Sequence, residues 1–368
     1  MINSSDIINY KKIGFDWQKY IDLQKEKILE RISKFSNWRL YLEIGWKFIF
    51  DSHAARILPW FIPESKKVIF HSIRDQIEIL FCVNSQDIIE NRQLSNQDID
   101  YSSYVLTTLK QIEKSVGVRP HLVINKIDTQ NMFDIILSFE REFQREWYKV
   151  RERYKINWYP NNTDFILSED WFWNDDHIPL TKNLILVTWA ASSSWKMSTC
   201  LWQIYLDHEI WIESWYAKYE TFPIWSIDIN HPINLAYEAA TADIWDYNCI
   251  DQFYQKAYWK SAVNYNRDME AFHIVIWITK QIIKHTNFMW TYKSPTDMGI
   301  SNAWFAITDD QITSIASLQE ITRRKLRYQQ MLDRNEWNIK WIQKCDELEK
   351  KCIDYIKAKW YNLQLCLQ

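Results

Sequence analysis

The clearest structural signal in the chain is Asn183-Leu184-Ile185-Leu186-Val187-Thr188-Trp189-Ala190-Ala191-Ser192-Ser193-Ser194-Trp195-Lys196-Met197-Ser198-Thr199-Cys200. Its first part is a short apolar run, which predicts a buried strand over 184–188. A turn of small residues follows, and the sequence after it predicts a helix over 197–208. A buried strand, a short turn and a helix form the unit from which α/β sheets are built.

The same unit recurs along the first 230 residues. Apolar runs predict strands over 39–44, 77–83, 121–124 and 163–168, with helices over 18–35, 52–58, 101–116 and 131–147. This alternation predicts an α/β protein with a doubly wound, mostly parallel sheet and helices on both faces. The ligands of such sheets bind beyond the carboxyl ends of the strands.

The pattern becomes mainly helical after about residue 228. Helices are predicted over 234–246 and 268–285, and one or two charged helices over 311–359. We therefore expect three parts: an α/β domain over 1–228 that includes the turn, a helical and polar-loop segment over 229–310, and C-terminal helices over 311–368.

Composition is that of an ordinary globular protein. The 368 residues are 47% hydrophobic and 25% charged, with a formal net charge of -3. A near-neutral charge without a basic block argues against a nucleic-acid partner. The sequence has no 18-residue apolar run and no apolar signal peptide, so we expect a cytoplasmic protein without a membrane partner. A homo-oligomer stays open.

Glycine and tryptophan occur in unusual numbers, with 4 Gly and 22 Trp. Average glycine usage is about 7%, and the two counts together (4 + 22 = 26 of 368) give a similar share. Trp60, Trp189 and Trp195 stand where turns favour glycine. Some bacteria read the codon UGA as glycine, whereas a common alternative genetic code reads it as tryptophan. We therefore hypothesise that many of these tryptophans are miscoded glycines; a protein truly rich in tryptophan is the alternative.

The turn over 188–199 is the strongest functional signal. A turn between a buried strand and a helix directs backbone N–H groups and the helix dipole at an anion. We expect Lys196 to hold phosphate, surrounded by Thr188, Ser192, Ser193, Ser194, Ser198 and Thr199. With glycine at 189 and 195 the turn approaches a nucleotide-binding phosphate loop, although Met197 stands where that loop has Ser or Thr.

Polar residues of the C-terminal half are expected to form the facing wall. Asn266 and Arg267 are predicted to bind the ligand, and Asp243 and Asp268 supply carboxylates for acid–base work or for Mg²⁺. Lys196, Asp243 and Asp268 are therefore the catalytic candidates. The expected cofactor is ATP or another nucleotide with Mg²⁺, and the metal ligands are left unassigned.

Other chemistries lack their motifs. The six cysteines show no CxxC spacing, so they predict free thiols rather than a zinc or redox site. His208-Glu209 lacks the second histidine of a zinc protease. Asn125-Lys126-Ile127-Asp128 matches the guanine-reading motif of GTPases, but no DxxG follows the turn. We interpret that match as accidental.

Several longer strings are distinctive. They include Tyr216-Ala217-Lys218-Tyr219-Glu220-Thr221-Phe222-Pro223, which is expected to end a strand, and the strings at 41–47, 53–61, 194–201, 231–243, 263–268 and 292–299. Together they resemble the bacterial family of domain of unknown function 1846 over about residues 10–330. The resemblance implies a cytosolic α/β protein with a helical insertion and no established reaction, although some relatives carry the label ATP-dependent peptidase.

The resemblance also bears on the tryptophans and on length. It implies glycine at the positions of Trp46, Trp60, Trp195, Trp215, Trp259 and Trp304. Members of the family are longer, so we expect a C-terminal portion of the protein to be missing here or encoded separately.

The sequence thus predicts binding of a nucleotide or a phosphorylated small molecule at the turn over 188–199. Phosphoryl transfer or hydrolysis is the natural reaction class for such a site. Two other classes stay open. One is a non-catalytic assembly or scaffold protein, whose mark is a large apolar self-interface. The other is a hydrolase or peptidase without HExxH, which needs a nucleophile beside a base.

Overall fold

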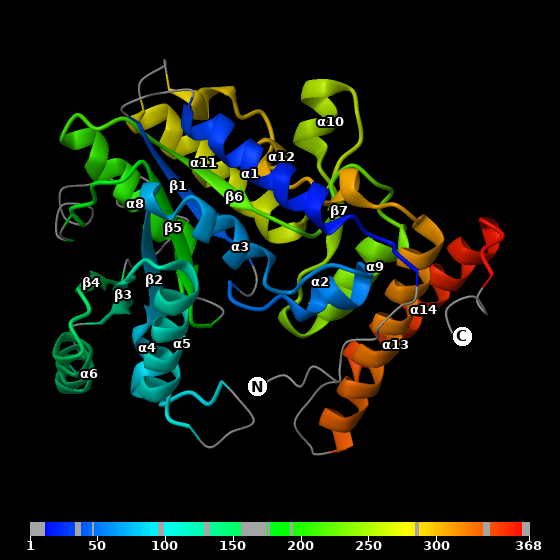
Figure 1. Cartoon of the computed structure of the whole chain (residues 1–368), viewed down its shortest axis with the longest axis horizontal. Coiled ribbons are helices and arrows are strands. Elements are labelled where there is room, and N and C mark those ends of the chain that lie inside the picture. The colour runs from blue at the N-terminus through cyan, green and yellow to red at the C-terminus, as the bar shows by residue number, and fades with distance from the viewer. Residues whose placement is uncertain are drawn as a thin grey trace.

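The structure is a computed structural model that describes residues 12–33, 38–45, 48–94, 99–128, 133–155, 175, 177–191, 194–283, 287–333 and 339–362. Seven strands form one sheet in the order β4-β3-β2-β5-β1-β6-β9, and every neighbouring pair in it is parallel. They are β1 (Arg39–Ile44), β2 (Ile77–Asn84), β3 (His121–Ile127), β4 (Val150–Tyr154), β5 (Leu184–Trp189), β6 (Ser214–Tyr219) and β9 (Gly299–Ile300). The predicted α/β class with a mostly parallel sheet is confirmed (Figure 1).

The central strands are buried, as their apolar sequences require. Every residue of β1 and β6 is buried, and in β5 only Trp189 is partly exposed. Unbroken apolar runs are typical of parallel strands that are covered on both faces. These strands form the middle of the hydrophobic core.

Five of the helices around the sheet lie close to their predicted positions, and two more were not predicted. The helices are α1 (Trp17–Ser33), α2 (Ser52–Ile57), α3 (Ser65–Ser72), α4 (Ser85–Ile89), α5 (Tyr101–Val116), α6 (Phe133–Arg145) and α8 (Lys196–Glu209), with the 3₁₀-helix η2 (Arg74–Gln76). The five that lie close to their predicted positions are α1, α2, α5, α6 and α8. The sequence did not predict α3, α4 or β4. The strand predicted over 163–168 lies outside the described residues.

Local signals fix the ends of α5. The carboxylate of Asp100 accepts a hydrogen bond of 2.8 Å from the N–H of Ser103 at the first turn. At the other end Gly117 has φ of 81°, and its N–H donates to the carbonyl of Glu113. Glycine is favoured there because a left-handed backbone crowds any side chain.

The C-terminal half is mainly helical. It contains α9 (Pro232–Ala240), η3 (Ala242–Ile244), α10 (Gln252–Tyr258), α11 (Asn266–Ile282), η4 (Phe288–Thr291), α12 (Pro295–Met298), η5 (Ala303–Ala306), α13 (Asp310–Asp333) and α14 (Lys340–Ala358), together with the antiparallel pair β7 (Asn248–Ile250) and β8 (Val263–Tyr265). β9 returns to the main sheet beside β6. The division of the chain near residue 228 stays a prediction.

A buried carboxylate attaches α13 to the rest of the fold. Glu320 accepts hydrogen bonds from Arg56 Nε at 2.6 Å and from Arg324 Nε at 2.9 Å. Burial alone would raise the pKa of Glu320, but bonds from Arg323 and His53 and the charge of Arg324 lower it well below its usual range. The carboxylate therefore stays charged and ties α13 to α2.

Cysteines and apolar helices show no special feature in the described part of the chain. Cys82, Cys200, Cys249, Cys345 and Cys352 are free thiols. None of the described helices combines the length and the apolar character needed to cross a bilayer.

The order of the strands reverses at β5. The chain runs from β2 through β3 to β4 at one edge of the sheet, and from β5 through β6 to β9 at the other. Ligands of open parallel sheets bind at such a reversal, outside the carboxyl ends of the strands. The helix that follows β5 is α8, so the turn that the sequence marked lies at this reversal.

Candidate functional site

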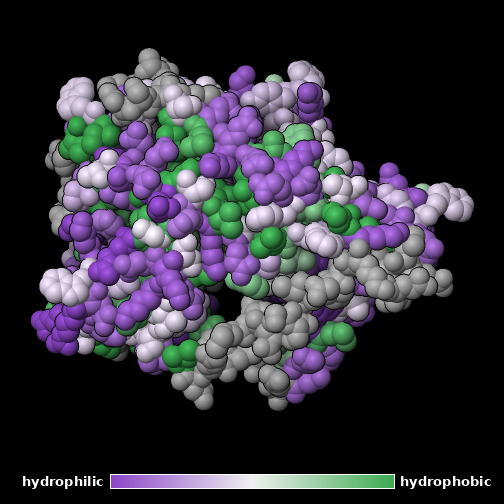
Figure 2. Space-filling view, viewed as in Figure 1, coloured by the Kyte–Doolittle hydropathy of each residue, from purple (hydrophilic) through white to green (hydrophobic). Residues whose placement is uncertain are grey.

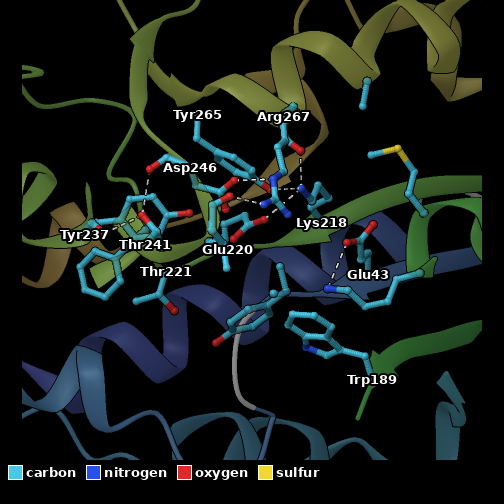
Figure 3. Close-up of a pocket in the computed structure, with 18 of the residues that line it drawn as sticks. Glu43, Trp189, Lys218, Glu220, Thr221, Tyr237, Thr241, Asp246, Tyr265 and Arg267 are labelled. Carbon is cyan, nitrogen blue, oxygen red and sulfur yellow. Dashed lines mark hydrogen bonds and ion pairs between the residues drawn. The ribbon is translucent and has the colours of Figure 1, made fainter. Parts of the chain in front are cut away.

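A cavity of about 380 Å³ opens at the carboxyl ends of β1, β5 and β6, and we call it the sheet-end pocket. Gly45 follows β1, Trp189 ends β5 and Glu220 follows β6, and all three line it. The facing wall comes from α9, η3 and α11 (Figure 3). Its ionisable lining residues are Glu43, Asp51, His53, Lys66, Lys196, Lys218, Glu220, Asp246, Arg267 and Asp268.

Lys196 lies in the pocket, but β1 already engages its ammonium group. Nζ of Lys196 donates to the carbonyl oxygen of Ile44 at 2.7 Å and lies 3.1 Å from Oε1 of Glu43. Glu43 also accepts a hydrogen bond of 2.7 Å from the hydroxyl of Tyr216. Burial would raise the pKa of Glu43, but the ammonium groups of Lys196 and Lys218 lower it. Lys196 is therefore paired with Glu43. The sequence had suggested an ammonium group that is free to hold phosphate.

Lys218 is the centre of a second charged group on the pocket floor. Its buried ammonium donates to Asp268 at 2.5 Å and to the hydroxyl of Tyr265, and it lies 3.3 Å from Glu220 (Figure 3). Burial would lower the pKa of Lys218, but the carboxylates of Asp268, Glu220 and Glu43 raise it well above its usual range. Lys218 is therefore a fixed positive charge.

Glu220 is the carboxyl group of this cluster with the most altered acidity. Burial, assisted by the negative charge of Asp268, raises its pKa to about 7 against the opposing effect of Lys218. Its Oε2 lies against the backbone of Gly45, where an added Cβ would come within 2.7 Å of it. The carboxyl group of Glu220 can therefore occupy this position only because residue 45 has no side chain. A group with pKa near 7 can both donate and accept a proton.

Arg267 and Asp246 form the rim opposite β5. Nε of Arg267 lies 2.5 Å from Oδ1 of Asp246, and its Nη2 donates to the carbonyl of Ile244 at 2.6 Å. Burial raises the pKa of Asp246 to about 6, although Arg267 opposes the shift. The Arg267 side chain is half exposed, whereas the side chains of Lys196 and Lys218 are largely buried. Arg267 is therefore the most accessible of these three cations.

The structure gathers only part of the predicted site. Ser194, Lys196, Ser198, Arg267 and Asp268 line the pocket. Thr188, Thr199, Asp243 and Asn266 do not, and Ser192 and Ser193 lie outside the described residues.

Two of the residues outside the pocket lie in other surroundings. The side chain of Asn266 accepts from the N–H of Tyr247 at 3.0 Å and donates to the carbonyl of Trp245. Thr188 is fully buried, and its hydroxyl makes no hydrogen bond within the described residues. Neither of these two side chains lines the sheet-end pocket.

Thr199 belongs to a buried polar cluster beneath α8. The guanidinium of Arg153 donates to Asn125 Oδ1 at 3.2 Å and to Thr199 Oγ1 at 3.1 Å, and it packs 4.4 Å from the ring of Trp202. Asn125 in turn donates to the carbonyl of Ser194 at 2.8 Å. Asn125, the first residue of the GTPase-like string, therefore holds the turn in place.

The sequence did not assign Glu43, Lys218 or Glu220 to the site. Lys218 and Glu220 carried a weak signal, because residues two apart at the end of a strand point to the same side. Glu43 carried none, since its partner Lys196 is more than 150 positions away. No group of three or more His, Cys, Asp or Glu side chains among the described residues is arranged to hold a metal ion.

The fold and the pocket define a doubly wound α/β protein with a polar site at its strand ends. Residues 13–352 match the family described as Domain of unknown function DUF1846, N-terminal, and the chain belongs to that family. The UPF0371 protein of Corynebacterium diphtheriae is 38% identical over 312 residues, 85% of this chain and 61% of the relative. That of Streptococcus sanguinis is 39% identical over 326 residues, 88% of this chain and 63% of the relative.

A third relative gives the same picture. The UPF0371 protein of Corynebacterium glutamicum (strain R) is 39% identical over 312 residues, 85% of this chain and 62% of the relative. The chain therefore spans less than two thirds of the length of these curated relatives. The predicted family is confirmed, and its description states no activity.

Proposed function

We propose that the sheet-end pocket binds a phosphorylated small molecule, with ATP and other nucleotides as the first candidates. The observation that carries the proposal is the place of the pocket, at the reversal of strand order and against the first turn of α8. Ser194, Lys196 and Ser198 line it from that turn. The first-turn N–H groups of a helix lack partners within the helix and attract anions.

Electrostatics support an anionic ligand. Four cations line the pocket, each beside a carboxylate: Lys66, Lys196, Lys218 and Arg267. The pKa values of Glu220 and Asp246, about 7 and about 6, leave these two carboxyls less fully charged near neutral pH than ordinary ones. Lys218 and Arg267 are therefore less neutralised than their close pairing suggests, whereas Glu43, whose pKa is lowered, stays charged beside Lys196. Arg267, which is half exposed, is the group best placed to grip a phosphate.

A reaction on the bound phosphate is a second part of the proposal. Glu220 is set to take a proton from an attacking hydroxyl or water, because its pKa lies near the working pH. Lys218, with its raised pKa, stays charged and can offset negative charge that develops in phosphoryl transfer or hydrolysis. If Mg²⁺ accompanies the nucleotide, it neutralises phosphate charge. The alternative is a hydrolase without a zinc motif, and the raised pKa of Glu220 supports it as well.

Calorimetric titration tests the binding proposal. ATP, ADP and inorganic phosphate, each with and without Mg²⁺, are titrated into the full chain and into Arg267→Ala. We expect Arg267→Ala to weaken binding by about tenfold or more, because it removes a charge-assisted bond to phosphate. Arg145→Ala, on the exposed end of α6, is the matched control and should change nothing. The proposal is rejected if none of these ligands binds, or if Arg267→Ala and Arg145→Ala bind alike.

A further inference from the structure

We infer that seven tryptophans of this chain are glycines in the protein as its own organism makes it, and that the indole at 195 occupies space meant for the phosphate group. The second half rests on the proposed function. The seven are Trp60, Trp147, Trp195, Trp211, Trp245, Trp259 and Trp360. What they share is a backbone with φ between 55° and 81°.

This backbone conformation is one that tryptophan avoids. Nine residues other than glycine have positive φ in the described chain, and seven of them are tryptophan. In the left-handed region Cβ crowds the following carbonyl, so glycine, and next Asn or Asp, usually occupies it. Asn91 is such a residue, and Lys126 is the ninth. A bulky aromatic residue has no reason to collect at these positions.

Helices α5 and α10 end in the same backbone conformation, one with glycine and the other with tryptophan. α5 ends at Gly117, whose φ is 81° and whose N–H donates to the carbonyl four residues earlier. α10 ends at Trp259 with φ of 56° and the same bond, from its N–H to the carbonyl of Gln255. One motif thus carries glycine in one helix and tryptophan in the other.

Three more helix ends repeat the pattern in its longer form. After α6, α8 and α14, the left-handed residue donates to the carbonyl three back, and the next N–H donates to the carbonyl five back. Trp147, Trp211 and Trp360 hold the left-handed position. This is the Schellman motif, in which that position is usually glycine.

Exposure separates these tryptophans from the ones that pack. Trp147, Trp211, Trp259 and Trp360 are each more than 80% exposed, although tryptophan is highly buried on average. Trp202, by contrast, is fully buried and has no positive φ. Four of the seven residues that the backbone selects thus lie outside the core, whereas Trp195 is partly buried against it.

The identity of residue 195 affects the sheet-end pocket. This residue is the N-cap of α8 with φ of 55°, and it is one of the residues that line the sheet-end pocket. The ring lies 4.9 Å from Nζ of Lys126. Glycine at 195 would remove the indole from the pocket beside the first turn of α8 and would leave the ammonium of Lys126 without that ring.

Thermal unfolding of full-length variants tests the identity of the residues. Trp195→Gly and Trp259→Gly should each raise Tm by roughly 2 °C, because the left-handed strain is removed. Trp225→Gly is the matched control, since Trp225 is partly buried and has no positive φ, and its Tm should stay or fall. Peptide mass analysis of the protein from its own cells should show glycine at 195 and 259. Tryptophan at these positions, or an equal response of all three variants, overturns the inference.

Titration with ATP and inorganic phosphate tests the consequence for the site. Trp195→Gly should raise the affinity by about tenfold or more relative to the chain that carries Trp195. Trp259→Gly should leave the affinity unchanged, because residue 259 does not line the pocket. Equal affinities for the two variants overturn the part about residue 195. If no variant binds any phosphate but both gain Tm and carry glycine in the natural protein, the proposed function fails and the residue assignment stands.

Discussion

At the scale of single residues, Gly45 shows how the lack of one side chain shapes the pocket. The carboxylate of Glu220 lies over its backbone, 2.7 Å from the place of a Cβ. A methyl group there forces Glu220 away from Lys218 or pushes the backbone of β6 aside. Both the position and the acidity of Glu220 depend on this contact.

Gly45→Ala should therefore destabilise the protein by about 1–3 kcal/mol through overpacking. Adding Glu220→Ala should recover most of that loss, because the clashing group is gone. Gly299→Ala is the control, since its Cβ would lie at an ordinary 3.4 Å from the nearest atom. Urea unfolding of the unsubstituted chain, Gly45→Ala, Glu220→Ala, the double variant and Gly299→Ala measures the effect. Additive losses in the double variant would contradict the proposed contact.

The raised pKa of Glu220 has a consequence for stability. A carboxyl whose pKa rises from 4.5 to about 7 on folding binds its proton more tightly in the folded state. The slope of stability with pH is then negative between these values, so its favourable contribution is full below about 4.5 and is lost as the pH rises to about 7. Glu220→Gln should flatten that decline in urea unfolding series. The exposed Glu209→Gln should keep it, and an unchanged decline in Glu220→Gln would refute the assignment.

At the scale of elements, the attachment of α13 depends on Glu320. Its buried carboxylate collects Arg56 from α2 and Arg324 from α13 itself. Such a cluster is stable only while the central charge is present, because removing it leaves buried cations together.

Glu320→Ala should cost about 3–5 kcal/mol in unfolding free energy, as loss of one partner of a buried charge cluster does. Glu349→Ala, which removes a more exposed partner of Lys325 on the neighbouring helix α14, should cost less than about 1 kcal/mol. Guanidinium unfolding compares the two. Similar costs for both variants would show that the Glu320 cluster is no anchor.

The elements differ in how far the sequence could predict them. β1, β2, β3 and β5 are apolar runs and were predicted, since a strand covered on both faces must be apolar. β4 reads Val150-Arg151-Glu152-Arg153-Tyr154 and lies at the edge of the sheet, where charged side chains are favoured. β9 has two residues and no local pattern. These two strands come from tertiary contacts that no window of sequence contains.

The site follows the same rule. The turn before α8 was predictable because a strand, small residues and a helix lie together in the sequence. The charge pairs were not, because Glu43 meets Lys196, and Lys218 meets Asp268, only after the sheet has formed. The prediction that Lys196 holds phosphate left out Glu43 for that reason.

At the scale of the whole molecule, the pocket joins the sheet to the helical half. Lys218 on β6 reaches Asp268 on α11 and Tyr265 on β8, so the two halves share buried charge. On the face shown in Figure 2, hydrophobic residues form small separated groups among hydrophilic ones. The described residues on that face form no broad apolar area of the kind that a scaffold interface needs.

Lys218→Met should destabilise the protein by about 3–5 kcal/mol, because it leaves Asp268 buried beside other carboxylates. Lys218→Met combined with Asp268→Leu should recover a large part of that loss, since the unpaired charge is removed with its partner. Denaturant unfolding of the single and double variants gives the coupling. A double variant as unstable as the sum of the singles would show that the contact does not join the halves.

The bond between Lys196 and Glu43 implies that ligand capture and protonation are linked. A phosphate that draws the ammonium of Lys196 toward itself leaves Glu43 with only one of the two ammonium groups that lower its pKa, that of Lys218. The carboxylate then becomes a stronger base and takes up hydrogen ions from the solution as the complex forms. The heat of association should therefore vary with the ionisation enthalpy of the buffer, and this variation should disappear in Glu43→Gln.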